Sequence, residues 1–503
     1  MKRSSKLISG ISTGYIYFFL NVAINLAIVP FILHFTGKLE YGLWITIMSI
    51  VGYIGLLDFG VATATSKFLS EINVDSFSNN KKIISNSIII YSILGGMVVF
   101  IVFVGMFFIG HFFGLTGRLL EIGSIAFLLA GLNLALSFPL SVFGSVLIGQ
   151  KELSLHNLIN IIGLLLNAFF TIVFLWFGFG IVGIAFVLLV VNILIALVRI
   201  YYTQKIIPSV FSGFWCFDRA IFRKILSFGF FMFVLNIGAQ IVFNTDNIVI
   251  AKILGVVYVT AYAIAFKMNQ AAISFVRKIA DSFFPFFSEL YSSGDKNKLI
   301  LYVFESTKFS VAIATPVFMV LTFWGKDIIS LWVGMENFVG RPAFCLMAIV
   351  TLMSSIIYPG AMALQGMGKV KTLVFFNIFE ALLNLFFSVF LAYKFGIFGV
   401  IFGTVLAMFL TNFWYVPFCL SRELQISLWR YVWETIILPF SLGVSLLFLI
   451  YFFDLFIENN NLFIITMKIS VLFCLYLLSF SFVCMDKNRR LFYMDKFRSF
   501  SLS

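Results

Sequence analysis

Apolar stretches long enough to cross a lipid bilayer recur along the whole chain. A membrane-spanning helix needs about 20 mostly apolar residues, and about fourteen stretches meet this requirement. Charged residues make up 11% of the sequence, against about 25% in soluble globular proteins. The sequence therefore predicts an all-α polytopic membrane protein with short connections. We expect the helices at roughly 11–35, 41–65, 83–109, 120–147, 155–177, 179–201, 227–251, 258–282, 300–324, 342–365, 371–393, 395–417, 434–456 and 462–484.

The second half of the chain repeats short motifs of the first half, in the same order, at an offset of about 217 residues. Each copy holds six predicted helices, and an even number gives both copies the same orientation in the membrane. We therefore expect two parallel six-helix bundles related by a pseudo-two-fold axis. The matched groups are Ser12 and Gly14 with Ser227 and Gly229, Phe68 and Glu71 with Phe286 and Glu289, Asn160 and Asn167 with Asn377 and Asn384, and Gly180 and Gly183 with Gly396 and Gly399.

The repeat and a charged connection predict the domain organisation. We expect an N-terminal six-helix bundle at 1–205, a cytoplasmic linker at 206–226, a C-terminal six-helix bundle at 227–420, and two additional helices with a basic cytoplasmic tail at 421–503. The linker is the longest connection and carries several basic residues.

Positive charges predict the orientation of the helices. Most of the 34 Lys and Arg residues fall on the side of the N-terminus, which the positive-inside rule assigns to the cytoplasm. Both termini are then cytoplasmic. The net charge of +13 is explained by this bias and by attraction to anionic lipid headgroups. We therefore expect no nucleic-acid partner. The basic residues expected on the opposite side are Lys38, Arg118, Lys252, Lys326, Arg341 and Lys394.

Motifs for nucleotide binding and for zinc-dependent hydrolysis are missing. The chain has no G-x-x-x-x-G-K-[ST] and no H-E-x-x-H. Its five cysteines are scattered and form no C-x-x-C motif. We therefore expect no enzyme activity, no cofactor and no metal site, and we expect any transport to run without ATP. The longest loop on the outer side, near 325–341, is too short for a catalytic domain.

The predicted helix at 258–282 carries unusual charges. At about 100° per residue, Lys267 and Lys278 lie about 20° apart around the axis, and Arg277 shares their arc. One interpretation places Arg277, Lys278 and Asp281 at the headgroup level, with Arg277 paired to Asp281. Lys267 lies about 15 Å into the helix, where a cation facing lipid is costly. We favour a functional cation lining a cavity.

The first helix of each bundle carries amide side chains at i,i+4 spacing. Asn21 and Asn25 form one stripe, and Asn236, Gln240 and Asn244 form the other. Two interpretations stay open: hydrogen bonds between helices, which membrane bundles use widely, or a polar cavity shared by the two bundles.

Two acids lie inside apolar stretches and are candidates for ion coupling. Asp58 either caps a broken helix at Gly60 or holds a proton or sodium ion. Asp246 lies near the outer end of its predicted helix.

The two-bundle pattern and two soft motifs resemble the multidrug/oligosaccharidyl-lipid/polysaccharide (MOP) exporter superfamily. The motifs are Leu-Leu-Asp-Phe-Gly at 56–60 and Leu-Gln-Gly-x-Gly-Lys at 364–369. Within it the chain looks most like the polysaccharide transporters, the Wzx-type O-antigen flippases of lipopolysaccharide biosynthesis. The resemblance implies a flippase of the bacterial inner membrane, which moves oligosaccharides linked to polyprenyl pyrophosphate to the outer leaflet by alternating access. The alternatives are a lipid II-type flippase and an ion-coupled multidrug antiporter.

The resemblance also implies partners and a site. A cationic cavity suits a pyrophosphate, and Lys267, Arg277 and Lys278 would supply its cations, with the amide stripes as further substrate-binding candidates. The expected partners are the lipid-linked oligosaccharide and membrane lipids, with other polysaccharide-assembly proteins and H⁺ or Na⁺ as further candidates.

Overall fold

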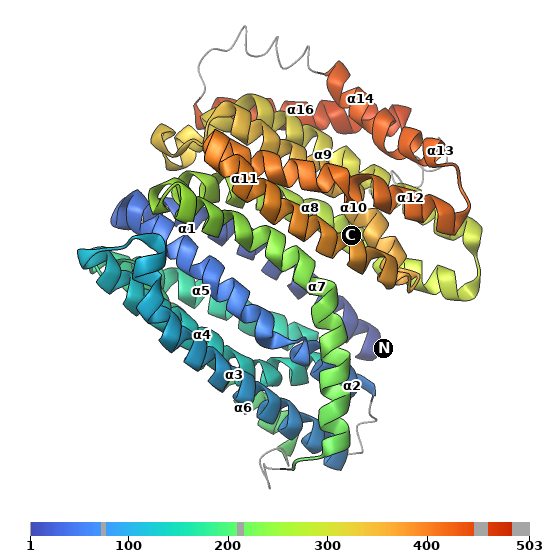
Figure 1. The fold of residues 1–503 in the computed structure, drawn as a ribbon. Coiled ribbons are helices and arrows are strands. Elements are labelled where there is room, and N and C mark those ends of the chain that lie inside the picture. The colour runs from blue at the N-terminus through green and yellow to red at the C-terminus, as the bar shows by residue number, and fades with distance from the viewer. Residues whose placement is uncertain (1, 72–76, 209–215, 447–460, 485–503) are drawn as a thin grey trace. The chain divides into compact units, whose positions relative to one another are not determined.

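The protein is helical almost throughout. The computed structural model describes residues 2–71, 77–208, 216–446 and 461–484, without the side chains of 2–8, 77–78, 231–232, 234–243, 370, 372 and 462. This described part contains helices and connections and no strand (Figure 1), so the predicted all-α fold is confirmed. The end of the predicted helix at 434–456, part of the linker and the basic tail lie outside the described residues.

Backbone contacts cluster into two compact units, Met1–Ala263 and Ile264–Ser503. The first unit contains α1 (Lys2–Ile54), η1 (Gly55–Asp58), α2 (Val61–Glu71), α3 (Phe77–Phe113), α4 (Gly117–Gly149), α5 (Leu153–Trp176), α6 (Gly180–Ile206), α7 (Arg219–Ile253) and the first turns of α8 (Val256–Ser293). Within this unit α4 packs against α1, α2, α3 and α6, and α7 packs against α1, α2 and α3. The packing of α7 explains why the division falls inside α8, later in the chain than the predicted linker.

The second unit holds the rest of α8 and all later helices. They are α9 (Lys296–Val333), η3 (Met335–Asn337), α10 (Arg341–Gly366), α11 (Val370–Leu410), α12 (Asn412–Leu424), α13 (Leu428–Val432), the π-helical turn η4 (Trp433–Ile437), α14 (Leu438–Ser445) and α16 (Leu462–Val483). One core cluster joins α8, α10, α12 and α13 through buried Phe287, Leu364, Leu420 and Tyr431. The helix α9 packs against α10, α14 and α16.

Nine helical segments of the described chain are long and apolar enough to cross a membrane. Two of them, Ser9–Asp58 with 50 residues and Leu373–Leu424 with 52, each cover two predicted spans. The helices α7 and α8 are not among the nine. In the most apolar part of α8, Lys267, Asn269 and Gln270 lower the hydropathy of the segment.

Glycines in unusual backbone conformations divide the long helices. Gly37 in α1 has φ 69° and ψ 176°, and Gly396 in α11 has φ 59° and ψ −139°. Gly37 lies between the predicted spans 11–35 and 41–65, and Gly396 is the second residue of the predicted span 395–417. In both cases one continuous run of helix serves as two. Gly180, the repeat partner of Gly396, also has a positive φ of 53°. The sequence repeat is therefore accompanied by a repeated backbone feature.

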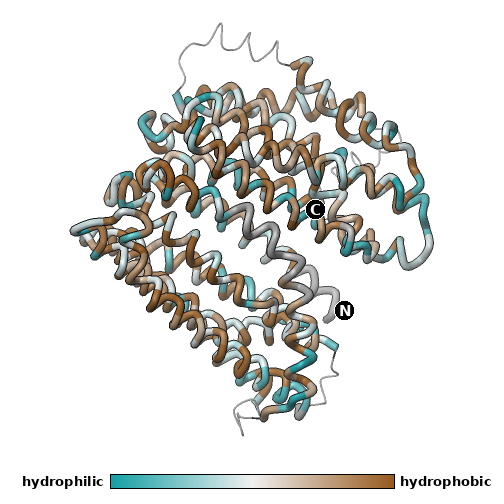
Figure 2. The backbone as a smooth tube through the Cα atoms, in the orientation of Figure 1, coloured by the Kyte–Doolittle hydropathy of each residue, from teal (hydrophilic) through white to brown (hydrophobic). Residues whose placement is uncertain are grey.

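The outer faces of several helices are apolar and open. In α3, Phe100, Phe103 and Phe107 are 69%, 54% and 66% exposed, and their spacing places them on one side of the helix. Figure 2 shows apolar residues along much of the length of the helices in this unit. Soluble monomers rarely expose large contiguous apolar patches, so this surface is suited to contact with lipid chains.

Candidate functional site

Lys267 lies on α8, at the start of the second unit. Its side chain is half-buried, and it forms no ion pair or hydrogen bond with any residue that the structure describes. Two residues later, the buried Asn269 bonds to the hydroxyl of Thr351 on α10. This bond anchors the helix turn that carries Lys267. An unneutralised cation on an anchored turn can bind an anionic group.

Arg277 and Asp281 meet at a tyrosine of α10. The guanidinium carbon of Arg277 lies 5.0 Å from the ring centroid of Tyr358, and the Tyr358 hydroxyl donates a hydrogen bond of 2.8 Å to Asp281 Oδ1. Cation–π contacts of this kind contribute about 0.5–2 kcal/mol. Tyr358 therefore holds both charged residues, and no feature of the sequence indicated its role.

The polar residues of α8 keep their predicted phase because α8 is one helix from Val256 to Ser293. The Ser274 hydroxyl donates to the carbonyl of Gln270 at 2.7 Å. Lys278 is half-buried one turn before the exposed Asp281. The three cations predicted for substrate binding thus lie on one helix, with Lys267 about 15 Å from the other two along the axis.

Asp58 lies at a break in the first unit. The 3₁₀ turn η1 ends at Asp58, Phe59 and Gly60 adopt positive φ, and α2 starts at Val61. Asp58 Oδ2 accepts the Gly60 N–H at 3.2 Å, and Oδ1 accepts the Tyr91 hydroxyl. Tyr91 in turn accepts the Ala62 N–H at 2.7 Å. The interpretation that Asp58 supports a helix break is confirmed, and an ion-coupling role stays a prediction.

A polar layer joins α1, α7 and the first turns of α8. The buried Asp246 accepts a hydrogen bond of 2.8 Å from Tyr262, and its neighbour Asn247 donates to Ser49 at 3.0 Å. Thr245 bonds to Tyr53. Each bond satisfies polar groups between helices, where unsatisfied groups are costly. Asp246 is therefore part of a hydrogen-bonded network between helices and does not lie on an isolated apolar face.

The predicted amide stripes are only partly described. Asn25 donates from Nδ2 to the Asn21 carbonyl at 2.9 Å and to Asn21 Oδ1 at 3.0 Å. Asn244 approaches Gly52, where an added Cβ would lie 3.0 Å from its Oδ1. The side chains of Asn236 and Gln240 lie outside the described residues. The idea of a cavity shared by the two stripes therefore stays a prediction.

The described end of the linker is attached to α3. Asn86 donates to the carbonyl of Cys216 at 3.1 Å, and Lys82 forms an ion pair of 3.2 Å with Asp218. Asp218 caps α7 by accepting the N–H groups of Ala220 and Ile221. The bond from Ile221, followed by that from Lys82, lowers the pKa of Asp218 below its ordinary value.

Two further charged residues of the second unit have protein partners. Glu380 on α11 accepts hydrogen bonds from Thr411 at 2.9 Å and Asn412 at 2.7 Å. Lys308 on α9 donates to the carbonyl of Cys484 at 3.2 Å. In the described residues no group of three His, Cys, Asp or Glu side chains is arranged to hold a metal ion.

The fold is that of known membrane transporters. A structure entitled "Lipid II flippase MurJ, inward closed conformation" matches with a TM-score of 0.74 at 16% identity, over 97% of this chain and 100% of that chain. An inward-facing multidrug resistance MATE family transporter of the MOP superfamily matches with a TM-score of 0.67 at 16% identity, over 81% and 95%. The chain therefore has the all-helical, multi-pass fold of these membrane transporters.

Family and sequence relatives narrow this class. A family model described as "Polysaccharide biosynthesis protein" matches residues 9–291, more than half of the chain, so the chain belongs to this family. A second model, MatE, matches residues 232–390. An uncharacterized membrane protein of Methanocaldococcus jannaschii is 22% identical over 85% of this chain and 87% of its own length. A candidate O-antigen transporter of Salmonella typhi is 22% identical over 78% and 91%.

Proposed function

We propose that the protein is a flippase that moves oligosaccharide units linked to polyprenyl pyrophosphate from the cytoplasmic to the outer leaflet of the bacterial inner membrane. Family membership and the transporter fold support a flippase. The proposed substrate rests on one observation: Lys267 is a half-buried cation without an acidic partner among the described residues.

A pyrophosphate fits the chemistry of α8. An ammonium group on a flexible stem offers three donors and can follow a moving phosphate. Lys267 would hold the pyrophosphate, with Lys278 and Arg277 closer to the cytoplasmic end as further contacts. The amide groups of Asn21, Asn25, Asn236, Gln240 and Asn244 would contact sugar hydroxyls. Asp58 and Asp246 remain candidates for coupling to H⁺ or Na⁺.

Two other transport functions make different demands on the same residues. A lipid II-type flippase needs the same cations and differs in the headgroup. A multidrug antiporter for cationic compounds favours acids in its binding site, and Lys267 disfavours that function. The described residues around Lys267 include no acid paired with it.

The accumulated lipid in a deletion strain tests the function. We expect loss of the gene to leave polyprenyl-linked oligosaccharide on the cytoplasmic side, measured by mass spectrometry of extracted lipids and by its resistance to an impermeant sugar-modifying reagent. Accumulation of lipid II would favour the second flippase function. Unchanged lipid-linked glycans together with lost drug efflux would overturn the proposal.

The first prediction concerns Lys267. Lys267→Ala should reduce export at least about tenfold, because one charge-assisted hydrogen bond contributes about 1.5–3 kcal/mol. It should leave folding intact, since removal of an unpaired cation relieves a desolvation cost. Lys267→Arg should keep part of the activity because the charge remains. Export is measured as surface glycan at equal membrane abundance.

Lys308→Ala is the matched control. Lys308 is another half-buried lysine of the second unit, and its Nζ donates to a backbone carbonyl. We expect this variant to export at close to the parental rate. Parental export by Lys267→Ala would show that the pyrophosphate is held elsewhere.

A further inference from the structure

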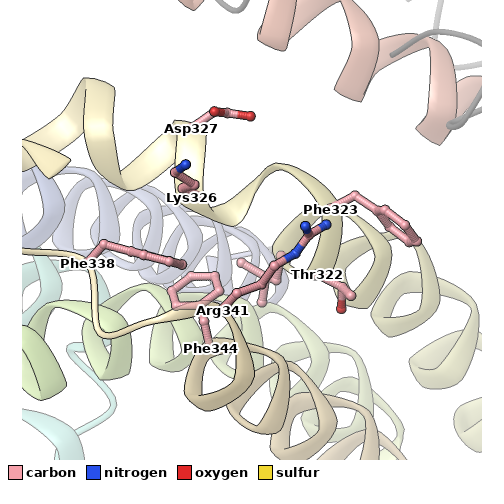
Figure 3. A pocket seen from close by; sticks show the side chains of 8 residues that line it. Thr322, Phe323, Lys326, Asp327, Phe338, Arg341 and Phe344 are labelled. Atoms are coloured by element: carbon pink, nitrogen blue, oxygen red, sulfur yellow. The ribbon is translucent and has the colours of Figure 1, made fainter. Parts of the chain in front are cut away.

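A small pocket lies in the second unit where α9 ends and α10 begins. It has a volume of about 130 Å³, well below the roughly 300–1,000 Å³ of sites for drug-sized ligands. The rings of Phe323, Phe338 and Phe344 form part of its wall (Figure 3). Such a space can take a small chemical group and is too small for an oligosaccharide.

The lining of this pocket has an excess of positive charge. Lys326 and Arg341 both line it, and both side chains are exposed. Neither forms an ion pair or a hydrogen bond with another part of the described chain. Asp327 is the acid of the lining, and Figure 3 shows it pointing away from Arg341. Two cations beside one carboxylate leave the pocket net positive.

The start of α10 adds to this positive potential. Arg341 is its first residue, and the preceding Gly340 has φ 97° and provides no side-chain cap. Pro342, the second residue of α10, has no N–H. The other N–H groups of the first turn carry the partial positive charge of a helix N-terminus, which is equivalent to at most roughly half an elementary charge. α10 has 26 residues, so its dipole is fully developed. The helix end and both side chains therefore favour an anion at the same place.

Packing holds the pocket in shape. An added Cβ on Gly325 would lie 2.2 Å from the ring of Phe344, so α9 and α10 approach closely here. In the connecting turn, the buried Asn337 donates to the carbonyl of Val333 at 2.6 Å, and the rings of Phe338 and Phe344 lie 5.6 Å apart. The walls are therefore organised before any ligand arrives.

We propose that this pocket binds the phosphate group of an anionic lipid. Both α9 and α10 contain segments able to cross a membrane, so their shared end lies near the level of the lipid headgroups. Arginine matches phosphate geometry with paired donors, and lysine adds a mobile charge. The aromatic walls suit the glycerol or isoprenoid carbons next to the phosphate. The proposal requires a membrane protein and does not depend on the flippase function.

The test measures lipid bound to purified protein by native mass spectrometry. The probes are phosphatidylglycerol, phosphatidylcholine and a polyprenyl pyrophosphate. The variant combines Lys326→Ala with Arg341→Ala. The control combines Arg118→Ala with Lys394→Ala, which removes two exposed cations from the same predicted side of the membrane. We expect the pocket variant to bind phosphatidylglycerol at least about tenfold more weakly, as loss of charge-assisted bonds requires, and the control to bind like the parent.

The outcomes separate the sources of the phosphate. Loss of phosphatidylglycerol binding in the pocket variant alone identifies a phospholipid site. If the pocket variant loses binding of polyprenyl pyrophosphate and keeps binding of phosphatidylglycerol, the phosphate in the pocket is that of the isoprenoid lipid. Equal binding by the pocket variant and the control, or binding of phosphatidylcholine as strong as that of phosphatidylglycerol, would overturn the proposal. Thermal stability of both variants in phosphatidylcholine shows that each is folded.

Discussion

At the scale of single residues, tyrosine hydroxyls donate hydrogen bonds to three acids on the helices of this membrane protein. Tyr91 donates to Asp58, Tyr262 to Asp246 and Tyr358 to Asp281. A phenol has a large apolar ring and one polar end, so it can reach an acid between apolar helices without adding a second charge. Asp58, Asp246 and Asp281 therefore each have a hydrogen-bond partner within the protein, which is independent of any role in transport.

The second prediction concerns Tyr91, which is fully buried. Tyr91→Phe removes one hydrogen bond to Asp58 and the acceptor of the Ala62 N–H. Groups left unsatisfied in a buried setting cost about 1–3 kcal/mol. We therefore expect a lower midpoint of thermal unfolding in detergent.

The control for this variant is Tyr393→Phe, which removes the hydroxyl of a tyrosine that is 74% exposed. Its unfolding midpoint should equal that of the parent. A Tyr91→Phe variant as stable as the control would mean that water or backbone replaces the lost hydroxyl at the helix break.

At the scale of elements, glycine decides where a long helix becomes two. Gly396 has φ 59° and ψ −139°, a conformation that is essentially restricted to glycine and costs other residues about 1–3 kcal/mol. As the third prediction, Gly396→Ala should destabilise the protein by roughly that amount. The midpoint of thermal unfolding measures the change in stability, and a binding or export assay measures the change in function.

A glycine of the first unit provides the comparison. Gly96 lies inside α3 with no atom near an added Cβ, and alanine is favoured over glycine in a helix interior by about 1 kcal/mol. Gly96→Ala should therefore be neutral or slightly stabilising. Destabilisation of both variants to the same extent would contradict a conformational role for Gly396.

Sequence periodicity predicted the helices well and their contacts poorly. Apolar length identified α3–α6, α9, α10 and α16, because each is one long run between short connections. It divided α1 at its glycine break, and it divided α11 two residues before the break at Gly396. It identified Asp58 as unusual but not its partner Tyr91, because residues 33 positions apart meet only through helix packing. The predicted shared cavity depends on Asn236 and Gln240, which lie outside the described side chains.

At the scale of the whole molecule, the distribution of positive charge predicts the orientation of the protein in the membrane. Lys296 and Lys298 lie in the first turn of α9, next to the connection from α8, and Asp295 pairs with Lys298 at 2.9 Å. At the other end of α9, Lys326 lies two turns before the connection to α10, and Arg341 is the first residue of α10. Over the full sequence, the side of the N-terminus has the larger share of positive charge, and basic loops are retained in the cytoplasm.

The fourth prediction places these two connections on opposite sides of the membrane. In a variant whose five cysteines are replaced by serine, Met335→Cys should react with an impermeant maleimide in intact cells. Ser293→Cys should react only after the cells are permeabilised. Both positions are exposed, so a difference in labelling reports the side of the membrane and not burial. Labelling of Ser293→Cys in intact cells with protection of Met335→Cys would reverse the orientation, move Lys326 and Arg341 to the cytoplasmic face, and place the termini outside.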